Sequence, residues 1–209
     1  YAAFLKCAAL ETINIPAAVK EIETGAFVDC DALNAVHITD IDAWCHIVFE
    51  IPYGLHPHFS EGASPLHYAK NLYLNGELVK EVTVPEDITD LSDHAFAGCT
   101  SLEKVTLPEG LVVIGEGAFL GCTSLKEIRI PSTVKAVQGY AFDGCTSLTA
   151  VTLPAGVKKI EYDVFYECSA LATIYVPAKK TDYYKKRLPE ELHDTIVELA
   201  PEKKTIAKK

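Results

Sequence analysis

The sequence predicts a stacked solenoid of parallel β-strands, on three observations. A Phe-x-x-Cys tetrapeptide occurs six times, and successive copies lie 23 residues apart except for one gap of 69 residues, which is three periods. Each regular copy follows an apolar strand pattern that ends at a proline position. The composition, with 49% hydrophobic residues and no uninterrupted apolar run long enough to span a bilayer, suits a water-exposed repeat protein. A fixed period of this length indicates coils that pack on their neighbours. The copies begin at Phe4, Phe27, Phe96, Phe119, Phe142 and Phe165.

The strand of each coil is expected in its first half. In residues 102–108 the pattern is Leu-x-x-Val-x-Leu-Pro, and the proline cannot donate to a strand ladder, so a short parallel strand should end there. In this pattern the side chains marked x face outward. The final position recurs every 23 residues as Pro16, Thr39, Gly62, Pro85, Pro108, Pro131, Pro154 and Pro177.

The second half of the coil is expected to turn back on itself. Its Val-x-x-Ile-Gly-x-Gly segment supplies two apolar contacts, followed by glycines that tolerate positive φ. This predicts a brief extended segment on the opposite side of the coil. The Ala-Phe-x-Gly-Cys segment then predicts a tight turn with Phe and Cys pointing inward.

Six of the seven cysteines occupy one repeat position, and Cys45 stands apart. Equivalent residues in coils about 4.8 Å apart form a row. We favour a ladder of reduced, buried thiols whose S–H groups face loop carbonyls. Disulfide bridges and metal binding are the alternatives, since the spacing does not exclude bridging.

Taken together, these motifs resemble the BspA-type leucine-rich repeats over about residues 1–178. The resemblance implies a right-handed leucine-rich-repeat solenoid of the horseshoe class. It has a parallel sheet on the concave side, short extended segments and tight turns on the convex side, and little helix. It also implies a secreted or surface protein of bacteria, with a role in adhesion and no catalytic set. Because Tyr1 falls inside a repeat, we expect the chain to be a fragment whose signal and anchor lie elsewhere.

In residues 40–78 the repeat motif is not recognisable, but the 23-residue spacing of the repeats on either side is maintained across the segment. This predicts a variant segment inside one continuous solenoid. Residues 39–42 resemble a capping box that opens a short helix over residues 42–49, with Trp44 covering the core. Asn75-Gly76 between alternating apolar residues predicts a type I′ hairpin. Similar segments occur as variant repeats in the resembled family.

Histidines and one cysteine gather in this variant segment, at Cys45, His46, His56, His58 and His67. The spacing matches no closed zinc signature, so no metal site or cofactor is predicted. A Cys45–His46 nucleophile pair is disfavoured, because adjacent helix residues point about 100° apart and no third group orients them. No catalytic residue and no enzyme activity are predicted.

The outward row of the concave face supplies the candidate ligand-binding residues, because solenoids commonly bind through this surface. The row consists of Asn14, His37, Thr83, Thr106, Arg129, Thr152 and Tyr175, of which all but Asn14 are the predicted site. The flanking rows alternate in charge as Lys80, Glu103, Lys126 and as Glu81, Lys104, Glu127. These predict cross-strand pairs that hold register. Arg129 and Tyr175 are less well explained by such pairing.

Charge divides the chain into a body and an end. Residues 1–178 carry 10 basic and 23 acidic side chains, whereas residues 179–209 carry 9 and 6. A net charge of −10 argues against nucleic-acid binding. We expect residues 179–200 to form a C-terminal cap, in which Tyr183 and Leu188 cover the last coil and residues 196–197 add a final extended segment, and residues 201–209 to form a flexible basic tail.

The main functional hypothesis is a noncatalytic recognition or adhesion module that binds a protein or glycan, through the concave face or the 40–78 segment. The alternative is a structural spacer that displays other domains. The chain is expected to be monomeric and not to insert into membranes.

Overall fold

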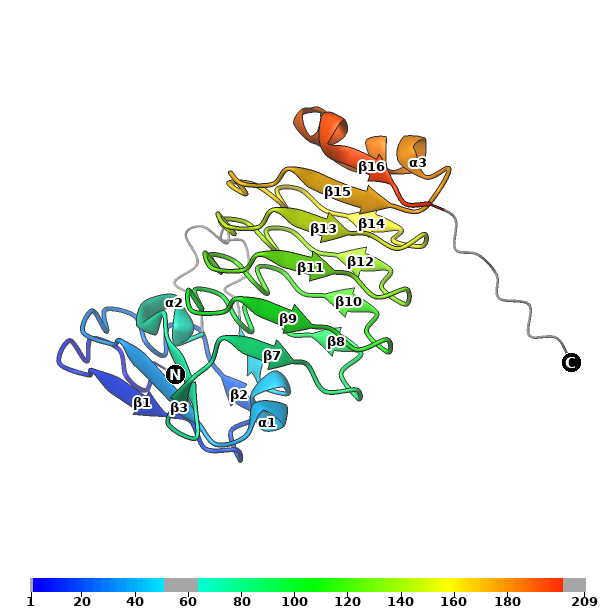
Figure 1. The fold of residues 1–209 in the computed structure, drawn as a ribbon. Coiled ribbons are helices and arrows are strands. Elements are labelled where there is room, and N and C mark those ends of the chain that lie inside the picture. Colours follow the sequence, from blue (N-terminus) through cyan, green and yellow to red (C-terminus); the bar gives the residue numbers. More distant parts are fainter. Residues whose placement is uncertain (1, 51–63, 201–209) are drawn as a thin grey trace, which may run out of the picture.

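The computed structural model describes residues 2–50 and 64–200 as a stack of coils (Figure 1). A six-stranded sheet runs along one side of the stack, and all of its neighbouring strands pair in parallel. Its side chains alternate between the core and the outside, as the strand pattern predicts. Its strands are β7 (Glu81–Thr83), β9 (Lys104–Thr106), β11 (Glu127–Arg129), β13 (Ala150–Thr152), β15 (Thr173–Val176) and β16 (Ile196–Glu198).

Short strands form the other side of the same coils. They pair in parallel in a four-stranded sheet, and each is followed within a few residues by a tight turn. These strands are β8 (Asp90–Leu91), β10 (Val113–Ile114), β12 (Ala136–Val137) and β14 (Lys159–Ile160). The predicted leucine-rich-repeat solenoid, with little helix, is confirmed.

A separate sheet begins the chain. It contains β1 (Thr12–Asn14), β3 (Ala35–Ile38), β5 (Leu72–Leu74) and β6 (Glu77–Leu78), while β2 (Glu21–Ile22) pairs with β4 (Val48–Phe49). The predicted type I′ hairpin is confirmed, because Asn75 and Gly76 have φ of 52° and 86° and β6 runs antiparallel to β5. This reversal ends the first sheet, and β7 starts the next. The solenoid is therefore continuous in its single apolar core but not in its sheet.

Two ladders run through the regular coils. The buried Phe rings stack on one another, with centroids 5.3–5.7 Å apart from Phe96 to Phe165. In the second ladder a thiol donates to the carbonyl of the Phe one coil earlier, as in Cys145 Sγ to Phe119 O at 3.2 Å. The same contact is made by Cys30, Cys122 and Cys168. All seven cysteines are free, and the predicted thiol–carbonyl contact is confirmed for these four.

Backbone hydrogen bonds in the turns point in one direction along the stack. The N–H of Phe96 donates to the carbonyl of Ala118 at 2.8 Å, and the equivalent bond recurs from coil to coil. Ala95 holds the same repeat position as Ala118, but the coil before it has no Phe whose N–H could donate to the Ala95 carbonyl. Its carbonyl instead accepts from Nε1 of Trp44 at 3.1 Å, and Trp44 is fully buried. One indole thus replaces a missing backbone donor.

The variant segment differs in detail from its prediction. Helix α1 spans Ile41–Cys45, and its N-cap is Asp40, whose carboxylate accepts from the N–H groups of Asp42 and Ala43. The helix was predicted to continue to residue 49, but Val48 and Phe49 form β4 because they pair with β2. Helix α2 (Leu66–Ala69) packs against the turn at Gly98, where an added Cβ would lie 2.6 Å from a carbonyl oxygen of α2. Gly98 is therefore required by close approach.

The C-terminal segment covers the last coil. Helix α3 (Thr181–Lys185) is followed by the 3-10 helix η1 (Glu190–Thr195), and β16 pairs with β15. Tyr184 and Leu188 are buried, whereas Tyr183 is only partly buried and donates its hydroxyl to Val157 O at 2.7 Å. The predicted tail at 201–209 lies outside the described residues.

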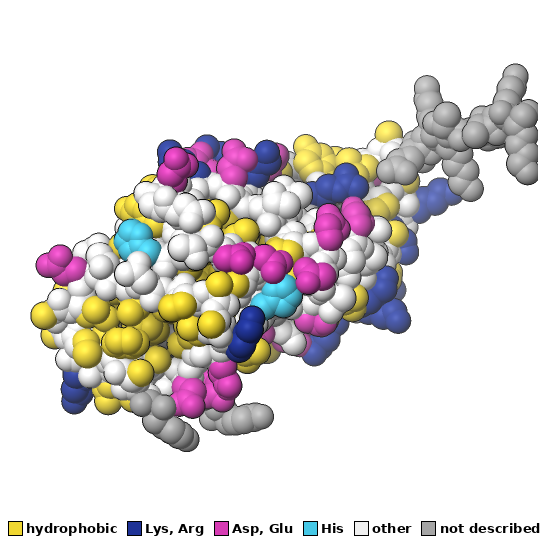
Figure 2. All heavy atoms as spheres, turned by 90° about the horizontal axis from the view of Figure 1, so that it is seen from below, with side chains coloured by type: hydrophobic (Ala, Val, Ile, Leu, Met, Phe, Trp, Pro, Cys, Tyr) yellow, Lys and Arg dark blue, Asp and Glu magenta, His cyan; other side chains and the backbone are white. Residues whose placement is uncertain are grey.

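The opposite end of the stack shows apolar surface. Figure 2 views the molecule from this end, where hydrophobic side chains gather. A shallow hollow of about 330 Å³ lies here, lined mainly by small and apolar residues that include Phe4, Val19 and Phe27. The two ends of the stack therefore differ, since only the C-terminal one carries helices and an added strand.

Candidate recognition groove

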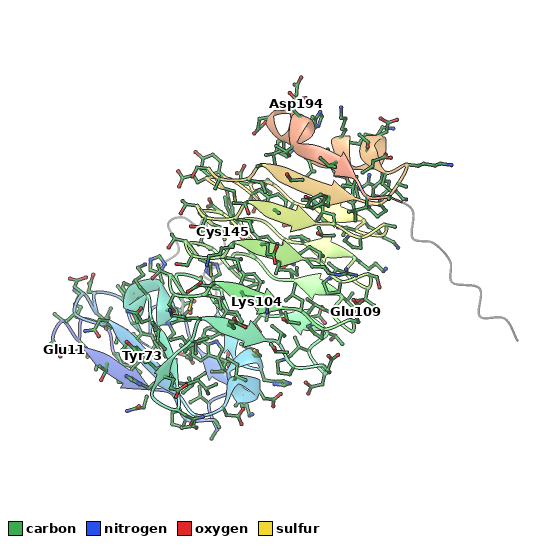
Figure 3. All side chains as sticks on the ribbon, viewed as in Figure 1. Glu11, Tyr73, Lys104, Glu109, Cys145 and Asp194 are labelled. Carbon is green, nitrogen blue, oxygen red and sulfur yellow. The ribbon has the colours of Figure 1, made fainter. Side chains whose placement is uncertain are left out.

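A groove of about 580 Å³ crosses four strands of the six-stranded sheet. Its floor is made by the strands β9, β11, β13 and β15, and residues that follow the strands form one side. In Figure 3, Lys104 lies on β9 and Glu109 lies in the turn beyond it. The polar lining residues are Glu86, Lys104, Thr106, Glu109, Glu127, Arg129, Thr152 and Tyr175.

Four of the six predicted site residues line this groove, namely Thr106, Arg129, Thr152 and Tyr175. Register places three of them on successive strands, with Arg129 opposite Thr152 and Thr152 opposite Tyr175. They form one row because the 23-residue period repeats the same strand position.

The other two predicted residues lie elsewhere. Thr83 on β7 is in register with Thr106 on β9, but Thr83 does not line the groove. His37 lies on β3 in the separate N-terminal sheet. The predicted row is therefore divided by the sheet break, and His37 is not part of the groove.

Two members of the row were missed by sequence reasoning. Tyr73 on β5 is in register with His37, and the rings stack with centroids 4.8 Å apart. Val197 on β16 is in register with Tyr175 and is largely exposed. Neither follows a recognisable repeat, but the hairpin signal at 75–76 could have placed Tyr73 on a strand.

Three of the predicted cross-strand pairs in the two charged rows are ion pairs in the described part of the chain. Glu103 lies between Lys80 and Lys126, at 3.6 and 2.6 Å, and Lys104 lies 3.6 Å from Glu81. The hydrogen bond and charge of Lys126 lower the pKa of Glu103. These side chains are mostly exposed, so their individual contributions are small.

Arg129 differs from these lysines. It is exposed on β11, and within residues 2–50 and 64–200 no carboxylate lies in ion-pair distance of it. Of the cations that line the groove, Lys104 has a carboxylate partner among the described residues and Arg129 has none there.

The cysteines offer no reactive thiol at the groove. Cys122 and Cys145 are buried, and burial raises the pKa of both thiols well above the usual value. Burial also raises the pKa of Cys45 to about 12. A thiol held protonated in this way is a poor nucleophile.

His46 contacts two aspartates, Asp42 and Asp87. Its Nε2 lies 3.4 Å from Asp87 Oδ2, and its Nδ1 lies 2.8 Å from the carbonyl oxygen of Asp42. Asp42, His46 and Asp87 are all exposed, with possible ligand atoms within 4.8 Å of one another. The contact links α1 to the turn after β7. His56 and His58, considered above as metal ligands, lie outside the described residues.

A comparison with known protein families identifies the family of this chain. The sequence profile described as BspA type leucine-rich repeat region, with six copies, matches residues 1–46 and 69–187. The chain belongs to this BspA-type leucine-rich repeat family. The gap in the match falls within the variant segment, where the repeat text is lost.

Solved structures show the same fold. A leucine-rich repeat protein from Bacteroides ovatus is 23% identical with a TM-score of 0.52, over 92% of this chain and 43% of that one. A leucine-rich cell surface protein from Faecalibacterium prausnitzii is 22% identical with a TM-score of 0.53, over 87% and 52%. A leucine-rich repeat protein from Eubacterium ventriosum is 22% identical with a TM-score of 0.54, over 81% and 43%. The BspA-type chain thus spans about half the length of these proteins or less.

No curated protein sequence matches the chain. Among the described residues, every helix is too short or too polar to cross a bilayer.

Proposed function

We propose that this BspA-type chain is a noncatalytic recognition module of a surface or secreted bacterial protein, and that the groove across β9, β11, β13 and β15 is its binding site. The observation that carries the proposal is the groove itself. It gathers two threonines, a tyrosine and an arginine that has no carboxylate partner among the described residues, all on one sheet. Groups held on strands need little reorganisation on binding.

Membership of the BspA-type family supports the proposed surface or secreted location. One solved relative is described as a leucine-rich cell surface protein, and this chain carries BspA-type repeats. Adhesion to an extracellular macromolecule is the activity that a surface-exposed groove of this kind would serve. A spacer role would need no such groove.

A bulky side chain inside the groove tests the proposal. Thr152 lies at the centre of the row, so Thr152→Trp should fill the groove while leaving its charges intact. Thr146 lies in the exposed turn of the same coil, and Thr146→Trp is the matched control. An array of extracellular matrix proteins and glycans is probed with the wild type and both variants.

We expect the wild type and Thr146→Trp to bind the same ligand and Thr152→Trp to lose at least 90% of the signal. Binding that survives Thr152→Trp would show that the site lies elsewhere. An array without any ligand for the folded wild type would favour the spacer.

A further inference from the structure

The charged residues are unevenly distributed along the groove, and this distribution limits the kind of ligand that can bind there. This inference rests on the proposed function, because it concerns the same site. Arg129 lies near the middle of the groove and lacks a carboxylate partner among the described residues, whereas Lys104 is paired with Glu81 at 3.6 Å. A guanidinium binds a carboxylate through two parallel hydrogen bonds. The unpaired fork therefore favours a ligand that carries a carboxylate.

The two halves of the groove differ in charge. On the side towards β7 the lining includes Glu86 and Glu109, and Glu127 lies on β11, the strand that carries Arg129 itself. Glu109 accepts from the hydroxyl of Ser132 at 3.1 Å, and Glu127 is in register with Lys104. These carboxylates would repel a second negative charge on that side. A ligand with one carboxylate at Arg129 fits better than a continuous polyanion.

In the part of the chain that the structure describes, the half towards β15 contains no charged lining residue. It presents Ala150, the hydroxyl of Thr152 and the ring and hydroxyl of Tyr175. Successive strands are about 4.8 Å apart, which is comparable with the length of one pyranose ring, so Arg129 and Tyr175 lie roughly two sugar units apart. Each strand would thus meet one sugar or one linkage.

The groove floor disfavours a protein anchor. The apolar residues beneath the row, including Val105 and Ile128, are buried in the core. Protein interfaces obtain most of their affinity from aromatic or apolar anchors that enter desolvated pockets. Here the accessible row is made of hydroxyl groups, one guanidinium and one tyrosine, which match a polyhydroxylated ligand with a planar apolar face for Tyr175.

We propose that the groove binds an acidic glycan, with the carboxylate of a uronic acid on Arg129 and a neutral sugar placed towards Tyr175. The bound stretch carries one carboxylate. The hydroxyl groups of the neighbouring neutral sugar donate hydrogen bonds to Thr152 and accept hydrogen bonds from it.

Calorimetric titration with a defined probe tests this assignment. The probe is a tetrasaccharide that carries one uronic acid among neutral N-acetylhexosamines, and the matched ligand is its carboxyl-reduced, neutral form. Arg129→Gln removes the guanidinium and should weaken binding of the acidic probe at least tenfold. Lys135→Gln removes one positive charge outside the groove and should change affinity less than twofold. Tyr175→Ala should weaken both the acidic and the neutral ligand.

Equal affinity of wild type for the acidic and reduced forms would overturn the proposal, and so would unchanged affinity in Arg129→Gln or the absence of binding to either form. The array experiment separates this failure from that of the recognition role. If Thr152→Trp abolishes binding of a protein or neutral glycan while the tetrasaccharide does not bind, the groove is a recognition site but its ligand is not an acidic glycan.

Discussion

The six-stranded sheet and the four-stranded N-terminal sheet come from one 23-residue plan but are built differently. From Phe96 to Phe165 every ring has a ring beside it, and the thiols of Cys122, Cys145 and Cys168 donate to carbonyls of the previous coil. Between Phe27 and Phe96 those contacts give way to Trp44 and α2. The contrast teaches that the solenoid conserves a set of contacts between coils, which different residues can provide.

Removing a ring from the middle of the regular part should have the largest effect. Phe119 is fully buried between Phe96 and Phe142, so Phe119→Ala should lower the free energy of unfolding by about 3–5 kcal/mol. Phe4 has one ring neighbour and is only partly buried, so Phe4→Ala should cost clearly less. Urea unfolding of both variants measures the difference. Equal losses would show that the two parts rely on their rings to the same degree.

Acid should weaken the regular part at its first turn. His94 is buried, and burial lowers its pKa from 6.5 to about 4. As the pH falls below 6.5 the unfolded imidazole takes up a proton before the folded one, so the free energy of unfolding declines down to about pH 4. The loss is of the order of 3 kcal/mol.

The matched variant is His94→Asn, because His94 has φ of 54° and Asn tolerates this conformation. Subtracting its pH profile from that of wild type isolates the histidine contribution. A difference that is flat between pH 6.5 and 4 would contradict the assignment.

The indole that joins the two parts should have a smaller effect. Trp44→Phe keeps an aromatic ring but removes the N–H that donates to Ala95 O, and it leaves a buried carbonyl without that donor. We expect a loss of about 1–3 kcal/mol. Thermal or urea unfolding measures it, and a loss no greater than a few tenths would mean that the hydrogen bond is dispensable.

A single thiol should have the smallest effect. Cys145→Ala removes a buried contact to Phe119 O and should cost about 1 kcal/mol, whereas Cys7→Ala, at an exposed position, should cost almost nothing. Unfolding without reductant should also expose seven reactive thiols. A count of five or fewer would reveal a disulfide.

Repetition made most of the fold predictable. The Leu-x-x-Val-x-Leu pattern placed β9, β11 and β13, and the Phe and Cys positions placed the two ladders, because each pattern is repeated many times. The hairpin at Asn75-Gly76 was also predictable, since positive φ at both residues depends on local chemistry.

Tertiary pairing explains what was missed. Helix α1 ends at Cys45 because Val48 and Phe49 pair with β2, a partner more than 20 residues away. The division of the predicted row follows from the antiparallel β6: the hairpin was predictable from Asn75-Gly76, but its position at the edge of the first sheet depends on tertiary pairing. The row residues of the groove were predictable, but its closure by Glu86, Glu109 and Pro131 depends on how successive turns stack.

The turn hydrogen bonds also bear on how such a chain changes length over generations. Each regular coil offers N–H donors to the coil after it and carbonyl acceptors to the coil before it, as Phe119 does with Ala141 while Ala118 accepts from Phe96. Both surfaces of a regular coil are therefore interchangeable with those of its neighbours. A tandem duplication or deletion of one 23-residue unit within β9–β13 creates no new kind of interface between coils. The number of units there can therefore change while the packing between neighbouring coils stays the same. The Trp44 bridge and the C-terminal segment lack this equivalence, and they define the fixed points between which the array can grow or shrink.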